Sequence, residues 1–143
     1  MLEEEAFLRL QRTADAYLQL AAEFLKPYRL SPTQYNVLRI LRGAGDEGLP
    51  CGEIGNRMIT RDPDITRLLD RLENSGWVER ERLKTDRRVV LTRITAEGLR
   101  LVDSIDEPIW ALHRERLGRM GAERLRELIA LLGEARNLAA VED

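Results

Sequence analysis

Residues 80–93 hold the densest group of side chains that could bind an anion. Six cations occur there beside only two carboxylates: Arg80, Arg82, Lys84, Arg87, Arg88 and Arg93 against Glu81 and Asp86. The whole chain carries 23 basic and 25 acidic side chains and a net charge of −2, so this is a local basic segment on an acidic protein. Arginine presents a rigid fork of donors that matches phosphate oxygens and base edges. The segment therefore predicts contact with a nucleic acid, although high-GC codon usage explains the overall excess of arginine over lysine equally well.

A second group of polar side chains lies at the start of a predicted helix. Its members on the exposed turns are Asp64, Thr66, Arg67 and Arg71. Arginine can pair with guanine through two hydrogen bonds, and threonine can contact a thymine methyl group or a phosphate, so all four are candidate DNA contacts and Arg67 is the strongest for a base. Two alternatives stay open. Asp64 either accepts from cytosine N4 or complements the helix N-terminus, and Arg71 either contacts DNA or pairs with Asp70 or Glu73.

The spacing of apolar residues predicts four helices before the basic segment and two after it. The first four cover residues 6–25, 32–42, 51–58 and 63–75, and the last two begin at residues 96 and about 122. Ser31-Pro32-Thr33-Gln34 forms a capping box, Asp62-Pro63 supplies an N-cap and a first-turn proline, and Thr95 caps the fifth helix. Pro108 predicts a kink or a break between Asp106 and Ile109, because a proline inside a helix removes a hydrogen bond.

Residues 77–82 and 88–94 are strand-like runs that predict a hairpin with a basic tip. The third and fourth helices, joined by a tight turn, have the outline of a helix-turn-helix. We therefore expect a mainly α fold with a small β-hairpin, in the element order α-α-α-α-β-β-α-α. This order matches a winged helix, which places one helix in the major groove of DNA and its hairpin along the backbone or the minor groove.

The segment Gly43-Ala44-Gly45-Asp46-Glu47-Gly48 matches the G-x-G-x-x-G expression for nucleotide binding. That motif works between a strand and the N-terminus of a helix, where its backbone approaches a pyrophosphate. Here it follows a helix and carries two carboxylates where the pyrophosphate would sit. We predict an ordinary loop.

Residues 64–98 combine two groups of motif residues. The first group is Thr66-Arg67-Leu68, Leu72-Glu73, Gly76, Val78 and Arg80, and the second is Asp86, Arg88, Leu91, Thr95 and Gly98. In both groups the chain resembles the MarR family of bacterial transcriptional regulators, and the order and length of the flanking helices agree as well. The resemblance implies a single MarR-like domain over 1–143, with a winged helix-turn-helix lobe at 31–95 and dimerisation helices at 1–30 and 96–143.

The resemblance also implies a function and roles for particular residues. It implies a homodimer that binds a palindromic operator in double-stranded DNA and represses transcription. The apolar stripes on the terminal helices favour a dimer independently, because they exceed what a small core can cover. Two-fold symmetry would place the half-sites on the order of 34 Å apart. In the family the pair Asp86 and Arg88 forms the wing tip, with the arginine in the minor groove and the aspartate holding it. Arg87 is assigned to a phosphate, and Lys84 is included among the DNA contacts.

Many members of the family release DNA when a small aromatic or anionic compound binds between the dimerisation helices and the DNA-binding lobe. The candidate ligand contacts are Tyr28, Tyr35, Trp110 and His113. Each is otherwise a packing residue, and His113 could instead titrate near neutral pH.

Other classes of function have little support. No spacing of serine, histidine, cysteine and carboxylate suggests a catalytic arrangement, so we predict no enzyme activity and no cofactor, and one histidine with one cysteine argues against a metal site. Cys51 could be a reactive thiolate near a helix start, but redox-sensing relatives carry that cysteine in the first helix, where this chain has none. The alternative function is a winged-helix module that binds an acidic protein instead of DNA.

The sequence also predicts where the protein acts. No apolar run approaches the roughly 20 residues that cross a bilayer, and the acidic start Met1-Leu2-Glu3-Glu4-Glu5 is unlike a signal peptide. We expect a cytoplasmic protein with no membrane partner.

Overall fold

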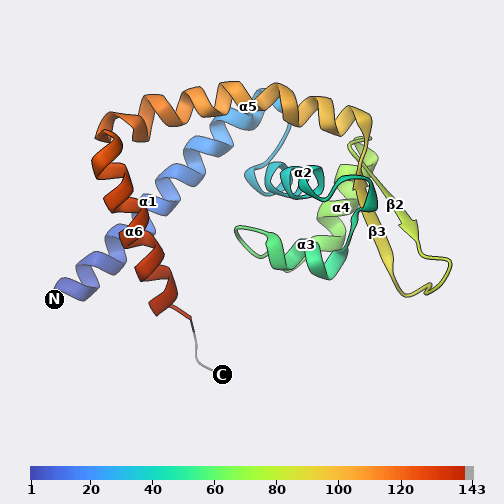
Figure 1. The fold of residues 1–143 in the computed structure, drawn as a ribbon, viewed down its shortest axis with the longest axis horizontal. Helices are drawn as coiled ribbons and strands as arrows, with labels where there is room; N and C mark the ends of the chain where they lie inside the picture. The colour runs from blue at the N-terminus through green and yellow to red at the C-terminus, as the bar shows by residue number, and fades with distance from the viewer. Residues whose placement is uncertain (141–143) are drawn as a thin grey trace. The chain divides into compact units, whose positions relative to one another are not determined.

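A computed structural model describes residues 1–140 and shows a mainly helical fold with one small sheet (Figure 1), which confirms the predicted fold class. The helices are α1 (Leu2–Leu25), α2 (Pro32–Ala44), α3 (Cys51–Arg57), α4 (Ile65–Asn74), α5 (Ala96–Arg116) and α6 (Ala122–Leu138). The strands are β1 (Leu49–Pro50), β2 (Val78–Arg82) and β3 (Val90–Ile94). Three short 3-10 turns are η1 (Lys26–Tyr28), η2 (Gly45–Glu47) and η3 (Leu117–Met120).

The chain divides into two compact units, of which the first covers residues 1–104 and the second begins at Ile105. The first unit contains α1 to α4, the sheet and the start of α5. The second contains the rest of α5 and α6. The prediction of a single MarR-like domain stays a prediction.

The core of the first unit lies between α2, α3 and α4. These helices bury Tyr35, Val37, Leu38, Leu41, Ile54, Leu68, Leu69 and Leu72. In α2 and α4 buried residues recur at intervals of three and four, so each of these helices turns one apolar stripe inward, and α3 contributes Ile54. Burying one such side chain contributes about 1.5–3 kcal/mol. This packing holds α4 in place and leaves its other face to solvent.

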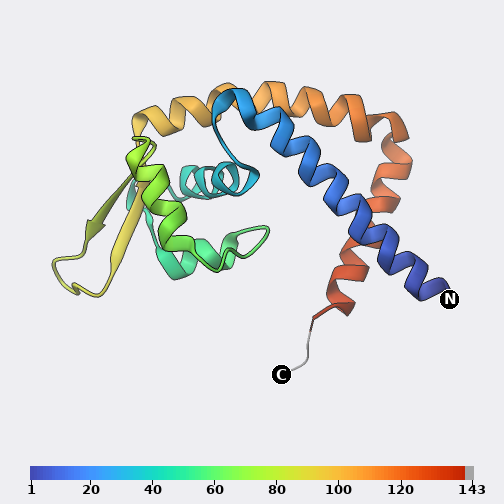
Figure 2. The same cartoon turned by 180° about the vertical axis from the view of Figure 1, so that it is seen from behind.

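The sheet has three antiparallel strands in the order β1-β3-β2. Val78 pairs with Ile94 and Arg82 with Val90, so β2 and β3 form the predicted hairpin. We call this hairpin, residues 78–94, the wing. Figure 2 shows that its tip extends away from α2, α3 and α4.

Strand β1 is absent from the sequence-based prediction, since two residues are too few to show a period. It pairs Leu49 with Thr92 of β3. Gly48 precedes it with φ +68°, and a Cβ there would lie 2.6 Å from the Thr92 carbonyl oxygen. Only glycine allows the chain to pass so close to β3 in this conformation.

Two of the predicted helix starts are confirmed by side-chain caps. Ser31 Oγ accepts from the Gln34 amide at 3.1 Å, and Gln34 Oε1 accepts from the Ser31 amide at 2.9 Å. Thr95 Oγ1 accepts from the Gly98 amide at 3.1 Å. Helix α1 starts four residues earlier than predicted, because the acidic side chains at residues 3–5 suit the positive end of a helix.

The prediction that Asp62 caps the fourth helix is wrong. Helix α4 begins at Ile65, and its N-cap is Asp64, which accepts from the Arg67 amide at 3.2 Å. Asp62 Oδ1 instead accepts from the Asp64 amide at 2.8 Å. Aspartate readily closes such a turn with the amide two residues on, and this turn delays the helix by two residues.

Of the two outcomes predicted near Pro108, the break is wrong, because α5 continues through the proline, and the kink stays a prediction. Pro108 and Ser104 are both exposed. The Ser104 carbonyl, which loses its helical N–H partner to the proline, therefore faces water that can bond to it. The buried residues of this stretch, Ile105 and Ile109, keep helical spacing.

The segment 43–48 forms the end of α2 and the turn η2, after a helix as predicted. Among the described residues, none of the helices combines the length and hydropathy that a membrane crossing requires.

Candidate nucleic-acid interface

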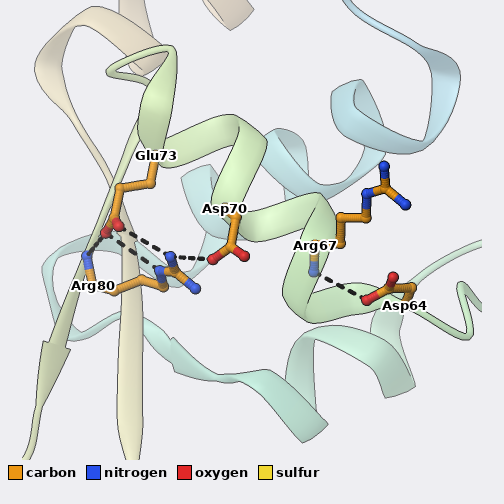
Figure 3. Close-up of polar contacts among 5 residues, drawn as sticks. All are labelled: Asp64, Arg67, Asp70, Glu73 and Arg80. Atoms are coloured by element: carbon orange, nitrogen blue, oxygen red, sulfur yellow. Dashed lines mark hydrogen bonds and ion pairs between the residues drawn. The ribbon is translucent and has the colours of Figure 1, made fainter.

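The exposed face of α4 carries the predicted base contacts. Thr66, Arg67 and Arg71 are exposed, whereas Leu68, Leu69 and Leu72 on the other face are buried. Arg67 and Arg71 line a shallow hollow of about 200 Å³ together with Asp62, Asp64 and Leu68. In Figure 3 the Arg67 guanidinium points away from the Asp64 carboxylate. Two guanidinium groups are therefore presented on one side of the helix.

Asp64 performs a local structural role in this face. Its carboxylate caps α4 through the Arg67 amide, which agrees with the alternative that it complements the helix N-terminus. A carboxylate that accepts hydrogen bonds from backbone amides of the first helical turn is stabilised by the positive end of the helix dipole. A contact of Asp64 with cytosine stays a prediction.

Arg80 joins β2 to α4 and is one of the best connected cations of the lobe (Figure 3). Its Nη2 donates to Asp70 Oδ1 at 2.5 Å and to Glu73 Oε1 at 3.0 Å, and its Nε and backbone amide donate to Glu73 Oε2 at 3.3 and 3.1 Å. Asp70 and Glu73 thus have Arg80 of the wing as a partner, and a pairing of either with Arg71 stays a prediction. Both carboxylates lie on the side of α4 that faces the wing, where Arg80 reaches them.

The Arg80 cluster shifts the titration of its members. Hydrogen bonds from Arg80 lower the pKa of Glu73 below its ordinary 4.5, and the same bonds raise the pKa of Arg80. Both shifts favour the charged forms. The pair is thus an ion pair throughout the neutral range.

The tip of the wing is a closed turn that presents cations. The Leu83 amide donates to the Val89 carbonyl at 2.9 Å, and the Val89 amide donates to the Asp86 carbonyl at 3.1 Å. Asp86 Oδ1 accepts from the backbone amide of Arg88 at 3.1 Å and from its Nε at 3.2 Å. The Arg88 side chain is 92% exposed, and Lys84 and Arg87 are exposed as well. The contact implied between Asp86 and Arg88 is present, while entry of Arg88 into a groove stays a prediction.

Arg82 and Arg93 bond to protein oxygens. Arg82 Nη1 donates to the Arg87 carbonyl at 2.5 Å. Arg93 Nε donates to the Asp46 carbonyl at 2.7 Å, and its Nη1 donates to Glu81 Oε2 at 2.9 Å. The exposed basic surface formed by residues 80–93 is therefore smaller than the six cations in the sequence suggest.

Sequence reasoning missed the partners of these arginines and one further contact. Asn36 of α2 accepts from the Ile59 amide at 2.9 Å and so holds the turn between α3 and α4. For Arg80 a signal was available, because Glu73 and Arg80 flank the turn at Gly76, which folds the end of α4 back towards β2. Asp46 lies 47 residues from Arg93, and Ile59 lies 23 residues from Asn36. No local pattern predicts contacts at these distances in the chain.

The four candidate ligand contacts are divided between the two units. Tyr28 packs on Phe24 with ring centroids 5.9 Å apart, and Tyr35 is buried with Arg39 over its ring. Trp110 is 49% exposed, and His113 is exposed too. Their role as ligand contacts stays a prediction.

Cys51 is the first residue of α3 and is half-buried. Within residues 1–140 no group of three or more histidine, cysteine or acidic residues is arranged to hold a metal ion.

Comparison with known proteins identifies the family. The model of the MarR family matches residues 30–90, which contain the whole helix-turn-helix and most of the wing. The crystal structure of a MarR transcription factor from Planctomyces limnophilus has 41% sequence identity and a TM-score of 0.74, over 93% of this chain and 96% of that one. The chain belongs to the MarR family of winged-helix transcriptional regulators.

Two other proteins similar to this chain are informative. The HTH-type transcriptional regulator PecS of Dickeya dadantii (strain 3937) is 33% identical over 107 residues, which are 74% of this chain and 64% of PecS. A cysteine-to-serine mutant of MarR from E. coli, crystallised with operator DNA, is 28% identical with a TM-score of 0.81 over 93% of this chain and 95% of that one. The described fold thus follows that of a MarR protein bound to its operator.

Proposed function

We propose that this protein is a sequence-specific regulator of transcription that binds a palindromic operator in double-stranded DNA as a homodimer. The observation that carries the proposal is the presentation of cations from two elements of one lobe. Helix α4 exposes Arg67 and Arg71, and the wing tip exposes Lys84, Arg87 and Arg88. A helix in the major groove and a hairpin along the backbone need this distribution of charge. The E. coli MarR mutant with operator DNA supports it.

The homodimer is supported by apolar side chains that this chain leaves exposed. In α1 the buried residue is Leu25, while Phe7, Leu10 and Leu18 are 57, 44 and 55% exposed. In α6 Ile129 and Leu131 are 69 and 63% exposed. Apolar surface of this extent is typical of an interface between protein chains, and a two-fold dimer would place two copies of α4 on two half-sites.

We further propose that DNA binding represses transcription and that a small aromatic or anionic compound relieves it. Tyr28, Tyr35, Trp110 and His113 are the proposed ligand contacts. This function involves no catalysis, and a regulator that binds bacterial DNA would act in the cytoplasm.

The test is binding of the purified protein to the DNA upstream of its own gene, measured across a salt series with and without salicylate. We expect sequence-specific binding by a dimer whose affinity falls steeply with salt, because basic side chains release counterions from the phosphates. Release by salicylate would support a ligand site. Binding that is equally weak on this DNA and on unrelated DNA would contradict the proposed function and favour a module that binds an acidic protein.

A further inference from the structure

The six cations of residues 80–93 fall into two sets by their contacts. Arg80, Arg82 and Arg93 donate to oxygens at least five residues away in the chain, whereas Arg88 donates to Asp86 of its own turn. Lys84, Arg87 and Arg88 extend from the wing tip. The side chains of Arg80 and Arg93 are 22 and 25% exposed, against 92% for Arg88. Arg82 is exposed, and its place in the first set rests on its bond to the Arg87 carbonyl.

We propose that Arg80, Arg82 and Arg93 are positioning residues that shape the wing and do not contact DNA, while Lys84, Arg87 and Arg88 carry the phosphate contacts of the wing. This inference rests on the proposed function. It divides the six cations into two sets whose removal should change DNA binding in different ways.

Arg93 links three segments at the base of the wing. It extends from β3, bonds to the Asp46 carbonyl of η2 and pairs with Glu81 of β2. Its charge is offset by that carboxylate at 2.9 Å, and its donors Nε and Nη1 are already used. A group bound in this way gains little from a phosphate, because it would first have to give up these bonds.

Arg80 links β2 of the wing to α4. Its contacts with Asp70 and Glu73 hold β2 against the helix that presents Arg67 and Arg71. They also neutralise two carboxylates of α4 that would otherwise repel DNA. The orientation of the wing relative to α4 therefore depends on Arg80.

Arg82 acts on the tip itself. Its bond to the Arg87 carbonyl fixes the peptide between Arg87 and Arg88. The side chains that extend from this peptide are two of the three cations proposed to contact phosphate.

The two sets differ in their effect on the salt dependence of binding. The slope of log K against log salt counts the phosphates that are neutralised, with about 0.9 for each. Removing a cation that contacts a phosphate lowers the magnitude of the slope. Removing a positioning cation lowers affinity at every salt concentration and leaves the slope unchanged.

The experiment compares Arg93→Gln with Arg88→Gln in the full-length protein on the operator identified above. Both variants remove one positive charge from the same hairpin, so a difference between them cannot come from net charge. Both are made in the otherwise unmodified protein, because Glu81 is one of the partners through which Arg93 is proposed to act. Thermal unfolding first establishes a temperature at which all the variants are folded.

We expect Arg93→Gln to weaken binding roughly tenfold, the cost of one charge-assisted hydrogen bond, with the slope of its parent. We expect Arg88→Gln to reduce the magnitude of the slope by about 0.9 for each subunit. We also expect Arg93→Gln to cost less affinity when Arg88→Gln is already present, because a positioning residue acts through the residues it places.

The inference is overturned if Arg93→Gln reduces the slope as much as Arg88→Gln does, since Arg93 would then contact a phosphate. It is equally overturned if Arg93→Gln leaves affinity unchanged, or if the two substitutions are additive. These results differ from failure of the proposed function, in which the unmodified protein shows no specific binding at all.

Discussion

At the scale of single residues, exposure separates Arg88 of the wing tip from Arg80 and Arg93, which bond to other elements of the fold. Arg88 lies at one extreme, with a side chain that is 92% exposed and paired with Asp86. Such an exposed pair contributes little to folding. Its proposed role is therefore in binding DNA.

Replacing Arg88 with alanine should therefore affect DNA binding without affecting stability. We expect weaker binding to all DNA sequences and a flatter salt dependence, by about 0.9 in slope for each subunit, with an unchanged melting temperature. Arg67→Ala is the comparison, since loss of a base contact should relax sequence preference at particular half-site positions. An Arg88→Ala protein with the affinity and slope of the unmodified protein would remove Arg88 from the interface.

Glu73 gives a prediction about pH. Arg80 lowers its pKa, so the ionised carboxylate is stabilised in the folded state. This contribution is present above the ordinary pKa of 4.5 and is lost as the pH falls through the lower pKa of the folded protein. Arg80 stays protonated throughout this range, because its own pKa is raised.

We expect Glu73→Gln to lower the free energy of unfolding by about 1 kcal/mol at pH 7, as for a partly exposed charged pair. The difference from the unmodified protein should shrink as the pH falls below 4.5 and through the lower pKa of Glu73 in the folded protein. Denaturant unfolding across pH measures this. Glu79→Gln, an exposed neighbour on β2, is the charge-matched control, and equal effects of the two substitutions at pH 7 would contradict the assigned role of Glu73.

At the scale of elements, the start of α4 is organised by two aspartates. Asp62 closes the turn before the helix and Asp64 caps it. The cap decides where the exposed turn with Thr66 and Arg67 begins.

Asp64 should therefore tolerate asparagine and not alanine. Asparagine retains an oxygen that can accept from the Arg67 amide, so Asp64→Asn should unfold near the temperature of the unmodified protein. Asp64→Ala should cost about 1 kcal/mol. Thermal unfolding measures both, and operator binding by Asp64→Asn separates the alternatives, because a changed preference at one half-site position would indicate a contact with cytosine.

The wing shows how much of an element could be predicted. Alternation over residues 77–82 and 88–94 indicates the hairpin, and the structure places its strands at residues 78–82 and 90–94. The pairing with β1 could not be predicted, because it depends on bringing Leu49 beside Thr92 through the fold of the whole lobe. The same holds for Arg93, whose partner Asp46 is distant in the sequence.

At the scale of the whole molecule, the exposed apolar face of α1 predicts self-association. Phe7, Leu10 and Leu18 recur on one side of the helix, and each is exposed in the single chain. Covering apolar surface is favourable by roughly 25 cal/mol for each Å². A second copy of the chain is the partner that the proposed two-fold operator requires.

A charge on this face should therefore oppose dimer formation. We expect Leu18→Glu to weaken self-association at least tenfold and to lower operator affinity with it, since two linked copies of α4 bind better than one. Ala16→Glu adds the same charge to an exposed position on the opposite side of α1 and should have neither effect. Sedimentation across protein concentration measures this, and a Leu18→Glu protein that stays dimeric would exclude this face of α1 from the interface.

The sequence by itself determined the order of the helices, the hairpin, most caps and the family, because these depend on periodicity and on contacts between residues close in the chain. It also placed Arg67, Arg71 and the wing-tip cations on exposed turns. Only the tertiary structure decided which cations remain available to DNA. Arg80 and Arg93 are chemically identical to Arg88. What distinguishes them is that packing brings carboxylates and carbonyls of other elements to their guanidinium groups, whereas Arg88 pairs with Asp86 of its own turn and stays 92% exposed.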